Sequence, residues 1–165
     1  MLTNRTDTPI NVTVYTKGVP PAGEEDEAAS EVELKVAFRD MARNPIDITS
    51  IRQGTDFMAD VQVRNADPRE LENVVLAQLF AAGFQVKNPM FAAGLERPTG
   101  YDYQDVRDDR VITFFSLRPR EEKTFLVILN ASYLGRFYQP GAAAEVMYDA
   151  SAHANSKGNW VNIVQ

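Results

Sequence analysis

The strongest constraint on the fold of this chain is a simple alternation of apolar and polar side chains. In residues 31–39, Val32, Leu34, Val36 and Phe38 fall on one face, while mostly charged side chains occupy the other. A period of two residues is typical of a β-strand with one buried face, and the 3.6-residue period of an amphipathic helix is almost absent from the chain. The pattern predicts an all-β protein.

Strand-length segments recur along the chain at a spacing of about ten residues. They lie at residues 57–64, 74–80, 84–87, 111–117, 125–131, 136–138, 143–148 and 160–164. Gly, Pro and Asn stand between them, which favours an antiparallel β-sandwich over a sheet built from βαβ units. The polar stretch at 118–121 predicts a hairpin between its two neighbouring segments. Only residues 89–94 and 149–155 would accommodate a helical turn.

The inward faces of these strands define the expected core. A chain of 165 residues hides roughly 70% of its unfolded surface when it folds, so that it needs no disulfide or metal. The side chains expected to be buried are Val32, Leu34, Val36, Phe38, Val61, Val63, Val74, Leu76, one of Ile112 and Phe115, Val127 and Leu129.

Composition narrows the possible functions. The chain has 17 basic and 23 acidic side chains and a formal net charge of −6, which argues against nucleic acid or an anionic membrane as the main partner. It has no cysteine, which excludes disulfides, thiol catalysis, thiolate metal sites and an internal thioester within these residues. His153 is its single histidine, which leaves few ways to build a catalytic triad or a zinc site. We therefore expect neither an enzyme nor a cofactor.

The amino-terminal segment differs from the rest. Residues 9–15 alternate like a further strand, but residues 18–23 are rich in Gly and Pro and residues 24–27 are all acidic, which is linker composition. We therefore divide the chain into residues 1–29, a terminal strand of a preceding domain with its linker, and residues 30–165, the sandwich. A lone strand leaves its backbone groups unsatisfied, so we expect the residues before Ser30 to be poorly ordered or paired with another copy.

Two clusters have both a functional and a structural interpretation. The four aspartates among residues 101–110 would suit a calcium ion if a loop folded them inward, although the spacing of the known calcium loop is absent. Phe137, Tyr138, Tyr148 and Trp160 would suit a sugar-binding platform, or they fill the core, as aromatic side chains of a sandwich commonly do.

Several segments of the carboxy-terminal part resemble, in order and spacing, the last domain of bacterial alpha-2-macroglobulins. They are residues 79–88, residues 103–111, residues 134–141 with the sequence LGRFYQPG, and residues 144–148 with the sequence AEVMY. Residues 4–10, 18–20 and 48–57 extend the resemblance over nearly the whole chain. The resemblance implies an antiparallel sandwich of the macroglobulin or receptor-binding-domain type. It also makes residues 10–15 the last strand of the domain that flanks the thioester domain.

The resemblance implies a function that this chain would not perform alone. Members of the family are large envelope proteins that trap proteases, and in many of them cleavage of a bait segment exposes a thioester to the attacking protease. The chain would then be a non-catalytic carboxy-terminal module of a broad-spectrum protease inhibitor in the periplasm or cell envelope. Its partners would be the other domains of the parent protein and, through the full-length protein, the target proteases.

Within this resemblance, Met147 and Tyr148 match a Met-Tyr pair that is thought to shield the thioester in bacterial members. A thioether and an aromatic ring can exclude water from a small site without reacting themselves. The alternation leaves a structural interpretation, in which one of the two lies in the core and the other on the surface. A second function also stays open, namely a cell-envelope β-sandwich for interaction or carbohydrate binding.

Overall fold

The computed structural model describes residues 3–5, 7–9, 11–15, 18, 20–87 and 100–165. Within them it contains thirteen strands and no helix, so the all-β prediction is confirmed. The strands are β1 (Ala28–Ser30), β2 (Val32–Asp40), β3 (Ser50–Arg52), β4 (Asp56–Asn65), β5 (Leu71–Leu79), β6 (Phe84–Lys87), β7 (Tyr103–Val106), β8 (Arg110–Leu117), β9 (Glu122–Ala131), β10 (Gly135–Gln139), β11 (Ala143–Val146), β12 (Asp149–Asn155) and β13 (Asn159–Val164). A search of the same residues finds no helix that could cross a membrane.

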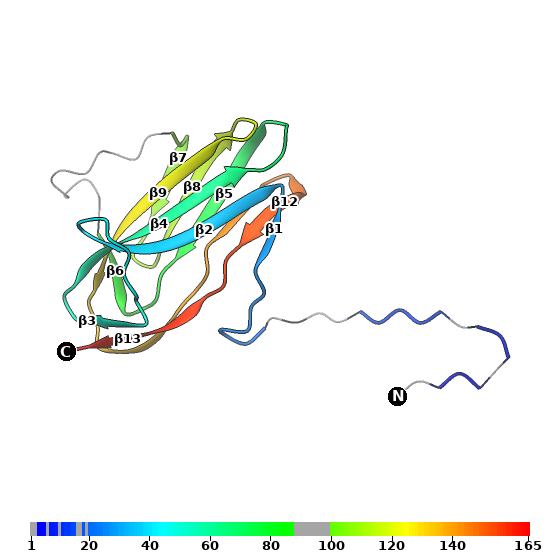
Figure 1. Ribbon diagram of the computed structural model, residues 1–165, viewed down its shortest axis with the longest axis horizontal. Helices are drawn as coiled ribbons and strands as arrows, with labels where there is room; N and C mark the ends of the chain where they lie inside the picture. Colours follow the sequence, from blue (N-terminus) through cyan, green and yellow to red (C-terminus); the bar gives the residue numbers. More distant parts are fainter. Residues whose placement is uncertain (1–2, 6, 10, 16–17, 19, 88–99) are drawn as a thin grey trace.

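Ten of the strands form one antiparallel sheet that folds over into two layers (Figure 1). Their order is β6-β9-β4-β2-β1-β12-β11-β5-β8-β7. The sheet folds between β2 and β1, whose register comprises the single pair of Ser30 and Val32. β4 and β9 then face β5 and β8 across the core, where the rings of Phe115 and Phe125 lie 4.6 Å apart. The predicted antiparallel sandwich is confirmed.

Two local expectations from the sequence are corrected. β8 pairs with β5 and β7, whereas β9 pairs with β4 and β6, so the predicted hairpin between them is wrong. Residues 118–121 instead carry the chain from one layer to the other, because a sandwich core must be covered from both sides. Residues 149–155 form β12 and not a helical turn, while residues 89–94 lie outside the described residues.

The expected core is confirmed except along β2. All the side chains expected to be buried on the other strands are buried, with Phe115 rather than Ile112 on β8. Leu34, Val36 and Phe38 are only half-buried. The reason lies in the sheet: β4 pairs with β2 along its whole length, but β1 meets its other edge only at Val32. One flank of these three side chains therefore stays open.

The remaining three strands form a small sheet in the order β10-β13-β3, near the carboxy terminus (Figure 1). Tyr138 of this sheet receives a hydrogen bond from the backbone amide of Gly23 at 3.1 Å. Asn155 Nδ2 donates to the carbonyl oxygen of Asp26 at 2.6 Å. The acidic residues expected to be a flexible linker are thus docked on the sandwich. Residues 11–15 are exposed, and no described strand pairs with them.

Candidate functional site

Met147 and Tyr148 form the turn between β11 and β12. Val146 pairs with Asp149, so these two residues close the hairpin. Both side chains point into solvent, with 49% of Met147 and 84% of Tyr148 exposed. The alternative expectation, with one of the two in the core, does not hold, because the alternation of β11 ends at Val146 before the pair begins.

The turn is held in place by a neighbouring strand. The backbone amide of Met147 donates a hydrogen bond to the carbonyl oxygen of Asn73 at 3.1 Å. Asn73 lies in an irregular part of β5, where the register with β8 shifts between Leu71 and Val74. Its φ of 57° places it in the left-handed region. This hydrogen bond continues the β11–β5 register, in which Val146 pairs with Val74, by one further pair.

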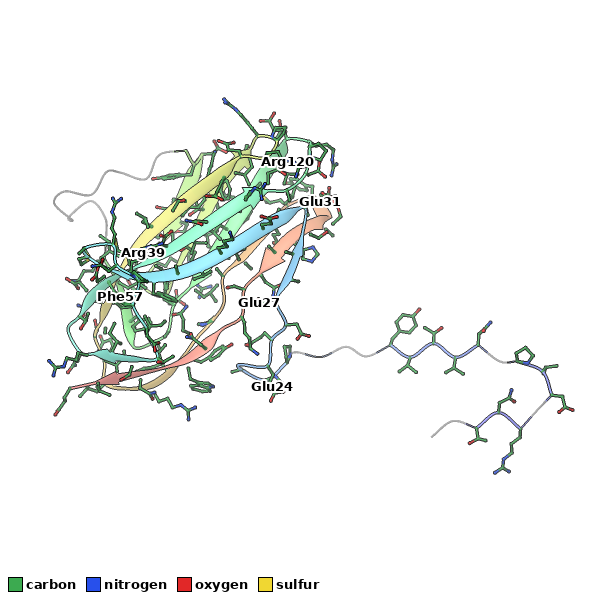
Figure 2. All side chains as sticks on the ribbon, in the orientation of Figure 1. Glu24, Glu27, Glu31, Arg39, Phe57 and Arg120 are labelled. Atoms are coloured by element: carbon green, nitrogen blue, oxygen red, sulfur yellow. The ribbon has the colours of Figure 1, made fainter. Side chains whose placement is uncertain are left out.

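Charged side chains surround the base of the turn. Arg69 contacts Glu31 at 2.8 Å and Asp67 at 3.0 Å, and hydrogen bonds from Arg69 lower the pKa of Asp67. Hydrogen bonds from the hydroxyl and the backbone amide of Ser151 lower the pKa of Asp149, which the positive charge of Arg69 lowers further. These carboxylates are therefore ionised at neutral pH. Glu31 and Arg120 mark this end of the sandwich in Figure 2.

Met147 and Tyr148 present a thioether and a phenol ring to solvent at the tip of the turn. Both groups offer apolar contact area to a partner surface. Asp67, Asp149 and Arg69 are engaged with each other and with the backbone. The arrangement is an apolar tip on a charged, hydrogen-bonded base, which suits contact with another protein surface.

Comparison with known proteins decides the family. Residues 32–150 match the family described as the bacterial alpha-2-macroglobulin MG10 domain. This chain belongs to that family. An alpha-2-macroglobulin homolog of Yersinia pestis is 26% identical over 156 residues, an alignment that covers 81% of this chain and 8% of the homolog.

Solved structures share the fold of this MG10 domain. Salmonella alpha-2-macroglobulin reacted with methylamine superposes with a TM-score of 0.79 at 17% identity, over 90% of this chain and 10% of that chain. Native Escherichia coli alpha-2-macroglobulin, from domain MG7 to the C-terminus, gives 0.79 at 17% identity over 90% and 25% of the two chains. The MG10 domain thus corresponds to a small part of these proteins, and the chain is a fragment of a bacterial alpha-2-macroglobulin-like protein.

The other clusters of the sequence do not assemble into sites. In the acidic segment, Arg107 pairs with Asp105 at 2.9 Å and Arg110 pairs with Asp109 at 2.6 Å. No group of three or more potential metal ligands gathers among the described residues. His153 lies exposed on β12, with Nδ1 3.1 Å from the carbonyl oxygen of Ala150. The acidic segment is therefore a salt-bridged strand and turn in this structure.

The four aromatic residues of the possible sugar platform are also dispersed. Tyr138 and Trp160 pack edge to face with their ring centres 5.5 Å apart, and Arg136 lies over the Trp160 ring at 4.5 Å. Phe137 packs against the core. Tyr148 lies beyond the opposite end of β12, a strand of seven residues and about 23 Å. The MG10 domain therefore has no single platform that combines them.

One further feature, a groove along the open edge of β2, was not predicted from the sequence. Its volume is about 820 Å³, and its lining includes Leu34, Val36, Phe38 and the carboxylate residue Asp60. The alternation in β2 predicted a buried face, and only the divergence of β1 from β2 creates the groove. To predict the groove, one would need to know that β1 and β2 pair at a single position. The sequence does not specify which strands pair.

Proposed function

We propose that this MG10 domain is a non-catalytic module of a protease-trapping bacterial alpha-2-macroglobulin. Its Met147-Tyr148 turn would cover the thioester region of the parent protein where the parent has one. The observation that carries the proposal is the exposure of both side chains of this pair at one hairpin tip. An apolar tip that is left unburied in the domain needs a partner surface, and a neighbouring domain supplies one.

The chemistry of a thioester explains why such a cover is useful. A thioester reacts with amines and with water, so an inhibitor must keep it dry until the protease has cut the bait. Met147 and Tyr148 together offer a deformable thioether and a flat ring, which exclude water without competing as nucleophiles. The backbone contact with Asn73 would keep the tip in position.

The wider role follows from family membership. We place the parent protein in the periplasm or cell envelope, where it would meet target proteases, and we assign residues 10–15 to the last strand of the preceding domain. The partners of the MG10 domain would then be other domains of the same polypeptide. The alternative, a sandwich for interaction or carbohydrate binding, lacks an assembled aromatic platform among the described residues.

The test uses the full-length parent protein and its reaction with methylamine before and after protease treatment. The informative variant is Met147→Ala/Tyr148→Ala. The matched control is Tyr133→Ala/Leu134→Ala, which removes another adjacent pair of exposed apolar side chains, with 62% and 46% exposure. We expect premature amine incorporation in the tip variant only, with thermal stability unchanged in both variants.

Each outcome separates the two levels of the proposal. Equal amine reactivity in wild type, tip variant and control would overturn the shielding role of Met147 and Tyr148. The protease-trapping role of the parent protein would still stand. A parent that neither incorporates amine nor restrains proteases after bait cleavage would overturn the trap itself and favour the interaction module.

A further inference from the structure

The two outer faces of the sandwich differ in chemistry. Strands of an antiparallel sheet with one buried face usually direct polar side chains to the other face. The outer face of β2, β4 and β6 follows this rule. Ion pairs join its strands, between Glu33 and Arg64 at 3.0 Å, between Arg39 and Asp60 at 2.6 Å, and between Lys87 and Asp56 at 2.7 Å.

The outer face of β5, β8 and β7 is apolar instead. Val75 and Ala77 of β5 pair with Phe114 and Ile112 of β8, and all four are half-buried. Tyr103 of β7 pairs with Phe114, with the two ring centres 5.8 Å apart, and it is 60% exposed. The core takes the alternate side chains of β5 and β8, so the fold of the domain does not require these five to be apolar. We call them the outer apolar face.

The outer apolar face adjoins the Met147-Tyr148 turn. In the register of β11 and β5, Val146 lies opposite Val74. The hydrogen bond from the Met147 amide to the Asn73 carbonyl continues this register by one pair. Val75 is therefore a diagonal cross-strand neighbour of Met147, at the roughly 7–8 Å that long side chains can span. The exposed turn and the outer apolar face thus belong to one side of the molecule.

We propose that the outer apolar face is an interdomain interface, and that it packs against the same neighbouring domain of the parent polypeptide as the Met147-Tyr148 turn. Exposed apolar patches on a soluble protein commonly mark a site of interaction with another protein surface. The identity of the partner rests on the proposed function, which assigns the turn to the thioester region. The outer apolar face enlarges that contact from one turn to a surface of three strands.

The size of the related proteins favours a partner within the same polypeptide. This chain covers 10% of the Salmonella protein and 8% of the Yersinia homolog, so most of such a polypeptide lies outside the structure. A domain tethered in the same chain is present at an effective concentration in the millimolar range, at which a small apolar contact is sufficient. The outer apolar face and the turn comprise far fewer residues than the roughly 20–30 per partner that interfaces between separate proteins commonly use.

Glu145 adds a requirement for charge. It is exposed on β11 and lies directly opposite Val75, at the border of the outer apolar face. The ion pairs among the described residues do not include it. Because charges across an interface are commonly complementary, we expect the partner domain to present a basic side chain opposite Glu145.

The first test maps the partner in the full-length parent protein. The photoreactive residue benzoylphenylalanine replaces Tyr103, Tyr148 or Tyr133, one at a time, and the cross-linked peptides are identified by mass spectrometry. Tyr133 is the matched control, because it is 62% exposed and Tyr103 is 60% exposed. We expect positions 103 and 148 to cross-link to one and the same domain of the same polypeptide, and position 133 not to reach that domain.

The second test measures how far the surface is covered. Hydroxyl-radical labelling is compared between the full-length parent and the 165-residue chain. Since the core of an interface is packed like a protein interior, labelling of Tyr103 and Phe114 should be at least about fivefold slower in the parent. Tyr103→Glu in the parent should restore the labelling of Phe114, and Tyr133→Glu should leave it slow. Both positions are exposed, so neither variant should change the thermal unfolding of the 165-residue chain.

The results separate this interface from the proposed function. Equally fast labelling of Tyr103 and Phe114 in the parent and in the 165-residue chain would overturn the interface. Cross-links from position 103 to a second copy, or to a different domain from that reached by position 148, would overturn the shared partner. Premature amine incorporation in Met147→Ala/Tyr148→Ala would still support the shielding role in each of these cases. Conversely, a parent without amine reactivity whose two positions cross-link to one domain would overturn the shielding role and support the interface.

Discussion

The backbone amide of Met147, at the tip of the β11–β12 hairpin, donates to the carbonyl oxygen of Asn73 in β5 at 3.1 Å. Asn73 and Met147 thereby extend the β5–β11 register by one pair beyond Val74 and Val146, and the φ of 57° at Asn73 accompanies the break in the ladder between β5 and β8. A backbone hydrogen bond in the register of the β5–β11 ladder therefore ties the turn that carries this exposed apolar pair to β5.

Replacing Asn73 should separate backbone conformation from side-chain contact. Asn73→Val should lower the free energy of unfolding by about 1–3 kcal/mol, because a β-branched residue is strained in the left-handed region. Asn73→Gly adopts the same φ freely and should remain close to wild type. Urea unfolding measures both, and the amide chemical shift of Met147 reports the contact. Equal stability of the two variants would show that the position is not constrained as the structure has it.

Arg39 and Asp60 form an ion pair beside the groove, and their contributions to the free energy of unfolding should be strongly coupled. Arg39→Met leaves the Asp60 carboxylate nearly buried without its cation, and we expect a loss of about 1–3 kcal/mol, reduced by the 31% exposure of the arginine side chain. Arg39→Met/Asp60→Leu should recover part of this loss, because no buried charge remains. A double-mutant cycle at low protein concentration measures the coupling. Additive losses would mean that water, and not Arg39, satisfies the carboxylate.

Two buried glutamines that line one small cavity should respond oppositely to the same substitution. Neither side-chain amide atom of Gln78 has a hydrogen-bond partner, whereas Gln139 accepts from the Ala81 amide at 3.0 Å and donates to the Leu79 carbonyl at 2.8 Å. Gln78→Met should therefore stabilise the domain by about 1–2 kcal/mol, and Gln139→Met should destabilise it by about 1–3 kcal/mol.

Calorimetry distinguishes these changes, since each kcal/mol shifts the melting temperature of a chain of this size by about 2–4 °C. Destabilisation by Gln78→Met would contradict the expectation and would place a bonded water in the cavity of about 10 Å³ that both glutamines line.

Alternation in the sequence was sufficient to predict the strands and the sandwich, because the burial of one face imposes a period of two on every strand. It could not predict which strands pair. Residues 111–117 and 125–131 are adjacent in sequence with a short polar connection, yet β8 and β9 lie in different layers. Alternation records that a face is buried, and it does not record which strand lies beside it.

The same limit explains the site and the groove. Met147 and Tyr148 could be singled out only through the family resemblance, and their common exposure depends on where β11 ends. Leu34, Val36 and Phe38 have the pattern of a core face, but they are half-buried because β1 leaves β2 after one pair. The sequence did not predict that the acidic segment docks on the sandwich. The composition of residues 24–27 does not indicate that the Tyr138 hydroxyl lies next to this segment.

That docking makes a prediction about pH. The Tyr138 hydroxyl, and after it the local backbone amides, lower the pKa of Glu25 from its ordinary value of 4.5. A carboxyl group whose pKa is lower in the folded state stabilises it fully above the unfolded value, and this contribution is lost as the pH falls through the folded value. Tyr138→Phe removes the main donor, so the pKa of Glu25 should rise toward 4.5 and the loss of stability on acidification should become shallower below that pH.

Carboxyl NMR titration measures the pKa, with Tyr133→Phe as the control because Tyr133 is 62% exposed. An unchanged titration of Glu25 in Tyr138→Phe would mean that residues 23–27 are not held by Tyr138 in solution.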